Sequence, residues 1–194
     1  MSAVQLAGLA LAALLSENFV MVNCLGIGTR TQAFRDPIEG WRTGFGLTLV
    51  LVCSGLLSRG VDLILLQARM EYLRLLAFAL LVPAASVALR WLIRLFLPEL
   101  SRRIEGPLRA VSSNAAALGA VLMASQRGYG LGQTFIFTLF GGLGVTAAMM
   151  SFAGLREEVS FESCPRPFRG APILFITAGL MALSLVGFYG LNLG

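Results

Sequence analysis

Two polar triplets interrupt apolar stretches, Ser-Glu-Asn at 16–18 and Ser-Ser-Asn at 112–114. Asn18 and Asn114 are 96 residues apart, close to half of the 194-residue chain. Glu17 is the only charged residue in the first 29 positions. A carboxylate can relay a proton or bind a cation, and amides can line the path of either. We interpret Asn18 and Asn114 as polar groups of a midplane site or of a helix break, and Glu17 as a proton or cation relay. The alternatives are that the amides only hydrogen-bond a neighbouring helix and that Glu17 lies near a water-filled interface.

Most enzymatic chemistry is excluded by the residue types. The chain has no histidine and no lysine, so a histidine-bound metal, a Ser-His hydrolase and a Walker-type phosphate loop are impossible. Cys24, Cys53 and Cys164 lack close-paired spacing and cannot build a metal cage by themselves. We therefore expect the chain not to be an enzyme on its own.

The elements that position these residues are membrane helices. Hydrophobic residues make up 57% of the chain and charged residues 13%, against about 45–50% and 25% in soluble domains. The stretches 130–155 and 171–194 contain no charge. The N-terminal stretch has no basic residue before Arg30, so we interpret it as a retained span and not as a cleavable signal peptide.

Charge-poor runs of suitable length predict six membrane-spanning helices. Their approximate ranges are 3–25, 41–58, 71–93, 106–126, 131–155 and 171–192. Pro83 favours a kink in the third span. Spans one and four share the polar triplets and glycine steps, which predicts two inverted three-helix repeats at about 1–97 and 98–194 within one membrane domain, 1–194.

All fifteen basic residues are arginine, and eleven of them lie on the links after spans one, three and five. The positive-inside rule places these links in the cytoplasm and both termini outside the cell membrane. The arginines are scattered on short links and are not interleaved with aromatic residues, so no nucleic-acid partner is expected.

Five ordered motifs run along nearly the whole chain. They are 17–22 (ENFVMV) with Leu25-Gly26, 113–120 (SNAAALGA), 152–158 (FAGLREE), 165–170 (PRPFRG) and 176–181 (ITAGLM). Together they resemble the RnfA/NqrE family, the membrane subunits of the Rnf ion-translocating electron-transport complex and of the sodium-pumping NADH:quinone reductase. The motif 165–170 favours the RnfA (RsxA) branch over NqrE.

The resemblance implies six spans in an inverted repeat and a homologous RnfE-like partner of opposite orientation in a bacterial inner membrane. It also implies a two-iron two-sulfur cluster near the midplane, shared with that partner, that passes electrons while ions move. The family's two ligand cysteines correspond to Gly28 and Ala115, which cannot bind iron. Cys24 lies one helical turn before Gly28 and is the one candidate for a displaced cluster ligand.

Three hypotheses follow for the function. The first is a subunit of an Rnf-type complex that couples electron transfer to cation translocation, or of its NqrE-like counterpart. In that complex a cluster is held mainly by the partner, or the electron path differs. The second is a stand-alone inverted-repeat transporter with Glu17, Asn18 and Asn114 at its substrate site. The third is a scaffold subunit that has lost its redox centre.

Overall fold

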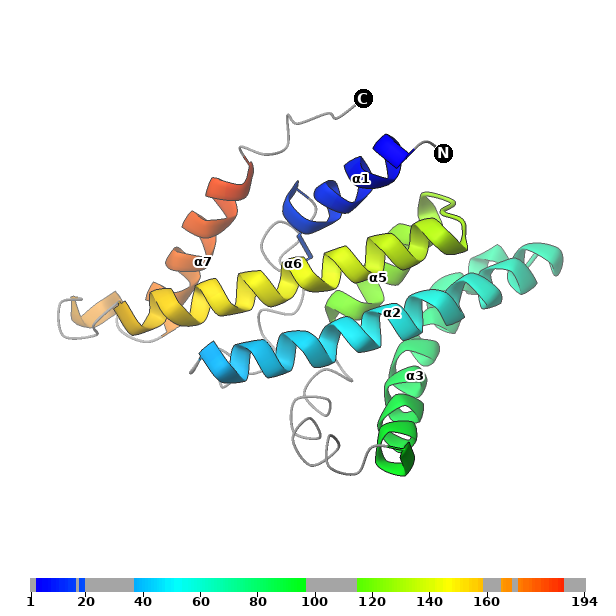
Figure 1. Cartoon of the computed structure of the whole chain (residues 1–194), viewed down its shortest axis with the longest axis horizontal. Coiled ribbons are helices and arrows are strands. Elements are labelled where there is room, and N and C mark those ends of the chain that lie inside the picture. The colour runs from blue at the N-terminus through cyan, green and yellow to red at the C-terminus, as the bar shows by residue number, and fades with distance from the viewer. Residues whose placement is uncertain are drawn as a thin grey trace.

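The computed structural model describes residues 3–16, 18–19, 37–96, 115–158, 165–168 and 171–186, and each regular element in these ranges is a helix. In chain order (Figure 1) the elements are α1 (Ala3–Leu11), the π-helical turn η1 (Ala12–Ser16), α2 (Pro37–Gln67), the 3-10 turn η2 (Glu71–Leu73), α3 (Arg74–Phe96), α5 (Ala115–Gln126), α6 (Leu131–Glu158), the 3-10 turn η3 (Arg166–Phe168) and α7 (Ala171–Val186). For these residues the predicted all-helical class is confirmed.

The centre of the molecule is the pair α2 and α6, which run side by side (Figure 1). They contain 31 and 28 residues, so at 1.5 Å per residue they are about 46 and 42 Å long. Gly44 faces Thr146, and Gly55, further along α2, faces Thr138, which lies earlier on α6. The two helices are therefore antiparallel.

Small residues allow these two helices to approach closely. A Cβ atom on Gly44 would lie 2.6 Å from Thr146 Oγ1, and one on Gly55 would lie 2.6 Å from Thr138 Cγ2. Glycine and threonine are enriched where membrane helices pack, because little hydrophobic force drives helices together in lipid. We call this contact the α2–α6 seam, defined by Gly44, Thr48, Gly55, Thr138, Gly142 and Thr146.

Within the described ranges, three helices are long and apolar enough to cross a membrane, namely Gly40–Gln67, Glu71–Phe96 and Leu131–Gly154. Three further apolar helices in the same ranges are shorter, namely Gln5–Leu15, Ala115–Gln126 and Phe175–Leu185. The predicted spans 3–25, 106–126 and 171–192 contain these shorter helices. Residues 20–25, 106–114 and 187–192 of those spans lie outside the described residues.

The second predicted span, 41–58, is shorter than the helix that contains it, because α2 continues to Gln67. In the sequence the charges of Arg59, Asp62 and Arg69 blur the end of this span. In the structure the side chains of Arg59 and Asp62 pair with each other on the same helix, so their charges do not end the apolar segment. The third predicted span, 71–93, matches η2 with α3, and α3 continues through Pro83.

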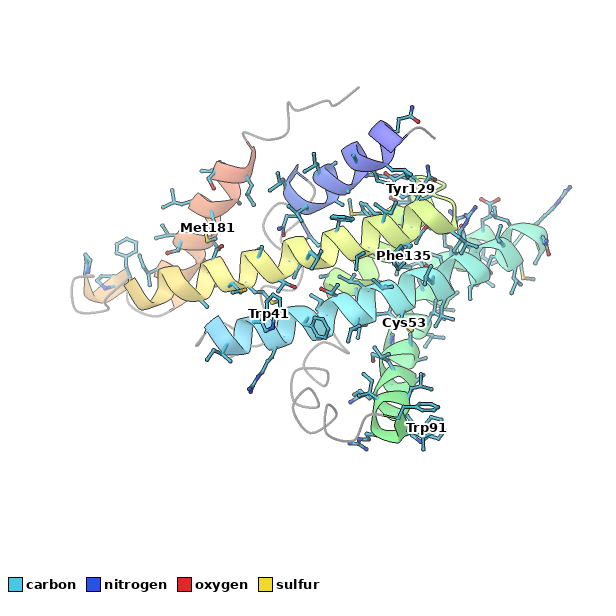
Figure 2. The ribbon with its side chains drawn as sticks, in the orientation of Figure 1. Trp41, Cys53, Trp91, Tyr129, Phe135 and Met181 are labelled. Atoms are coloured by element: carbon cyan, nitrogen blue, oxygen red, sulfur yellow. The ribbon has the colours of Figure 1, made fainter. Side chains whose placement is uncertain are left out.

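The remaining helices surround this centre. Helix α1 and η1 pack on α6, while α5 and α3 pack on α2. Helix α3 has five buried residues along its length, whereas Ala178 is the one buried residue among the described side chains of α7. Large apolar side chains such as Trp91 and Leu80 are exposed on α3, and Figure 2 shows Trp91 pointing away from the other helices. Such a surface is suited to lipid.

Candidate functional site

The first polar cluster lies where the N-terminal helix breaks. After η1 the chain leaves the helix, and Asn18, which is 3% exposed, donates a hydrogen bond from Nδ2 to the carbonyl oxygen of Gly144 at 2.8 Å. A π-helical turn often marks a functional position, because its wider spacing leaves the regular hydrogen-bond ladder. The asparagine thus ties the end of a short helix to the middle of α6.

Glycines on α6 make room for this break. A Cβ atom on Gly144 would lie 2.5 Å from the carbonyl oxygen of Leu14, and a Cβ on Gly141 would collide with the ring of Phe19. The backbone of η1 and the ring of Phe19 therefore rest directly on the backbone of α6. We call this region the break seat, defined by Leu14, Asn18, Phe19, Gly141 and Gly144.

An aromatic chain leads from the break seat to one end of α6. The rings of Phe19 and Phe137 meet edge to face with centroids 5.4 Å apart, and Phe137 meets Tyr129 in the same way at 5.4 Å. The guanidinium of Arg127 lies 5.6 Å from the centroid of Phe137 and 5.9 Å from that of Tyr129. Tyr129 lies beside the turn between α5 and α6 (Figure 2). These contacts fix the break seat against the start of α6.

Of the residues predicted for a site, the structure describes Asn18 and Ala115. Asn18 lies in the break seat, and Ala115 is the exposed first residue of α5. Glu17, Cys24, Gly28 and Asn114 lie outside the described residues. The functional role of the six residues therefore stays a prediction.

The second polar cluster was missed by the sequence analysis. Asp62 of α2 is 2% exposed and has two arginines beside it. Arg59 Nη1 donates a hydrogen bond to Asp62 Oδ2 at 3.1 Å, and Arg74 Nε, at the start of α3, lies 2.8 Å from Asp62 Oδ1. The sequence contains a signal for this ion pair, because Arg59 and Asp62 have helical i, i+3 spacing and apolar residues continue after them to Leu66.

Hydroxyl groups from both halves of the chain complete this cluster. The space beside Asp62 is bordered by Ser58 and Arg59 of α2, Ala124 and Ser125 of α5, and Thr134 of α6. It is too narrow to admit a water molecule. Ser125 Oγ is buried and finds no hydrogen-bond partner in the described part of the chain. We call Ser58, Arg59, Asp62, Arg74, Ser125 and Thr134 the Asp62 cluster.

A two-iron two-sulfur cluster requires thiolate ligands, and the residues at hand do not fit one. Ala115 presents a methyl group at the start of α5, and Gly28 has no side chain. Cys53, inside α2, is the one cysteine within the described ranges. Those ranges contain no group of three or more His, Cys, Asp or Glu side chains that could hold a metal.

Long apolar helices, a short helix that breaks inside the bundle and buried polar clusters define a polytopic integral membrane protein. A family model described as "Rnf-Nqr subunit, membrane protein" matches residues 6–192. The chain belongs to this family, as the motifs predicted.

Curated relatives support the same assignment over almost their full length. Proteins named as the A subunit of an ion-translocating oxidoreductase complex are 33% identical in Syntrophotalea carbinolica, 34% in Azoarcus sp. and 36% in Azotobacter vinelandii. The alignments cover 93%, 95% and 92% of this chain, and 94%, 96% and 93% of the relatives.

Proposed function

We propose that the chain is an integral membrane subunit of an Rnf-type complex that couples electron transfer to the movement of a cation across the membrane. The observation that carries this proposal is the similarity to the three oxidoreductase-complex relatives over more than nine-tenths of both chains. The break seat and the Asp62 cluster are in keeping with it, because buried polar groups in a bundle often mark a transport path.

The two inverted repeats, about 1–97 and 98–194, are supported by the contacts of the α2–α6 seam. Gly44 packs on Thr146 and Gly142 packs on Thr48, and each second-half residue lies 98 positions after its first-half equivalent. Each threonine donates to the carbonyl of the glycine four residues before it, at 2.9 Å. The two hydroxyl oxygens meet at 3.4 Å. Such reciprocal contacts are expected on a two-fold axis between repeats.

The proposed orientation places both termini outside a bacterial inner membrane. Helices α2 and α3 follow each other through a short turn, so in the proposed topology the start of α2 and the end of α3 face the same side of the membrane. Trp41 and Arg42 lie at the first of these ends, and Trp91 and Arg94 lie near the second. Tryptophan favours the membrane boundary and arginine favours the cytoplasmic side, which supports a cytoplasmic assignment for this face.

The proposed partners are an RnfE-like subunit of opposite orientation, the other Rnf subunits and membrane lipid. Any two-iron two-sulfur cluster shared with that partner would take its thiolates mainly from the partner, because Gly28 and Ala115 provide none. Cys24 is the single nearby alternative ligand.

Co-purification tests the proposal. A tagged chain, extracted in mild detergent from its native membrane, should elute together with flavin-containing and iron–sulfur-containing subunits. Elution of the chain alone, while a tagged RnfE-like subunit from the same cells retains its own partners, would support the stand-alone transporter.

A further inference from the structure

The Asp62 cluster carries one positive charge more than Asp62 needs for neutralisation. Two guanidinium groups lie within 3.1 Å of a single carboxylate that is 2% exposed. Placing uncompensated charge in an apolar surrounding is costly, and intramembrane ionisable groups are therefore rare and usually functional. One arginine would make the site neutral, so the presence of the second one requires an explanation.

The two arginines hold the carboxylate differently. Arg59 lies on the same helix and makes a true hydrogen bond to Oδ2. Arg74 Nε lies 2.8 Å from Oδ1, yet neither atom satisfies hydrogen-bond geometry with any partner in the described residues. Arg74 begins α3, directly after a turn, and its side chain is 23% exposed. Arg59 is thus the fixed counter-ion, and Arg74 is a neighbour that can withdraw toward solvent.

Hydroxyl-bearing side chains border the narrow space beside Asp62. Ser125 Oγ is buried without a partner in the described ranges. Ser58 Oγ donates its hydrogen to the carbonyl of Gly55 at 2.7 Å. The lone pairs of the Ser58 oxygen therefore stay available to accept or to bind a cation. The Thr134 side chain borders the same space. A carboxylate with several hydroxyl oxygens is a donor set that suits hard cations, and buried groups without partners call for such a ligand.

We propose that Asp62, Ser58, Ser125 and Thr134 form a binding site for a monovalent cation, and that Arg74 is the counter-ion of Asp62 Oδ1 that this cation replaces. Exchange of the Arg74 guanidinium for a free monovalent cation would leave the charge of the cluster unchanged. A divalent cation would add a further positive charge beside Arg59. The space beside Asp62 is too narrow for water in the present conformation, so cation binding requires these side chains to move apart as Asp62 exchanges Arg74 for the cation.

This inference rests on the proposed function, since cation translocation gives the site its purpose, but its test does not depend on electron transfer. Thermal unfolding of the detergent-purified native complex, followed through a fluorophore on this chain, is measured in NaCl and in choline chloride at equal ionic strength. Replacing Arg74 with Gln should lower the Na⁺ concentration for half-maximal stabilisation at least tenfold. Adding Asp62→Asn to Arg74→Gln should abolish the Na⁺ effect.

Two further variants test the Na⁺ response if Arg74→Gln folds poorly. Ser125→Ala removes an oxygen that has no described partner, so stability in choline should be retained while the Na⁺ requirement rises. Arg69→Gln, in the exposed turn before α3, is the matched control and should leave the Na⁺ response unchanged. Equal unfolding curves in the two salts for Arg74→Gln, or an unchanged Na⁺ requirement in Ser125→Ala, would overturn the proposal.

A proton and Na⁺ are distinguished by the same measurement. Stabilisation of Arg74→Gln by lower pH in choline, with no response to Na⁺, would refute an alkali-cation site. If the complex shows no redox-driven transport but Na⁺ binds as described, the site stands and the proposed function fails. If transport is intact and Na⁺ does not bind, the proposed function stands and the cation site fails.

Discussion

Replacing Gly55 with Ala should destabilise the protein, because the new methyl group has no room in the α2–α6 seam. Its Cβ would lie 2.6 Å from Thr138 Cγ2, about 1 Å less than the roughly 3.5–4.0 Å that non-bonded carbons prefer. Rotation of Thr138 would break the 2.7 Å hydrogen bond from its hydroxyl to the Thr134 carbonyl. Overpacking of this kind costs about 1–3 kcal/mol.

Gly60→Ala is the matched control on the same helix. A Cβ at Gly60 meets no atom within 4 Å, so this variant shows only the higher helix propensity of alanine, about 1 kcal/mol. The difference between the two variants therefore isolates the clash. Thermal unfolding in detergent measures this difference in stability, and each kcal/mol shifts the melting temperature by about 2–4 °C for a chain of this size.

The partner residue makes the test sharper. In Gly55→Ala with Thr138→Ser the offending methyl is removed, and the next atoms lie at 3.4 Å and 3.5 Å, so stability should return. At Gly44 the obstacle includes the Cα atom of Thr146 at 2.7 Å, so Thr146→Ser should not rescue Gly44→Ala. Equal melting of Gly55→Ala and Gly60→Ala, or equal rescue at both positions, would refute the packing argument.

Three further predictions concern the polar residues. Asn18→Asp should lower the unfolding free energy by more than the roughly 1 kcal/mol of an ordinary hydrogen bond, because a carboxylate would face the Gly144 carbonyl; a thermal melt equal to the unmodified chain would contradict this. Cys24→Ser should leave any midplane iron–sulfur signal of the assembled complex largely intact by electron paramagnetic resonance, and loss of that signal would make Cys24 a ligand. Asn114→Leu should reduce electron-coupled ion transport in proteoliposomes more than it reduces assembly of the complex on native gels, and equal loss of both would reduce Asn114 to a packing residue.

The break seat shows how far residue patterns reach. The polar triplet at 16–18 interrupts an apolar run, and this pattern alone predicted that Asn18 is a buried polar group. The prediction was possible because the free-energy cost of a polar group in a membrane helix depends on the residues next to it in the sequence. Its hydrogen-bond partner, the carbonyl of Gly144, is 126 residues away. A backbone acceptor has no side-chain signature, so the sequence could not reveal this contact.

The Asp62 cluster shows where local reasoning failed. The charges of Arg59, Asp62 and Arg69 interrupt the apolar run, so the prediction placed the end of the second span only approximately, near 58. In the structure Asp62 is buried beside Arg59 and Arg74, so its charge is compensated inside the bundle. Pairing depends on where α3 begins relative to α2, which composition does not contain.

The membrane class, the helical content and the family were determined by the sequence alone, since apolar runs and ordered motifs are properties of neighbouring residues. Only the tertiary structure decided which polar residues are buried together. It placed hydroxyls of α5 and α6 beside a carboxylate of α2, and it brought the glycines and threonines of two distant segments into reciprocal contact. Such contacts arise from helix packing, where the fit of surfaces far apart in the chain selects the neighbours.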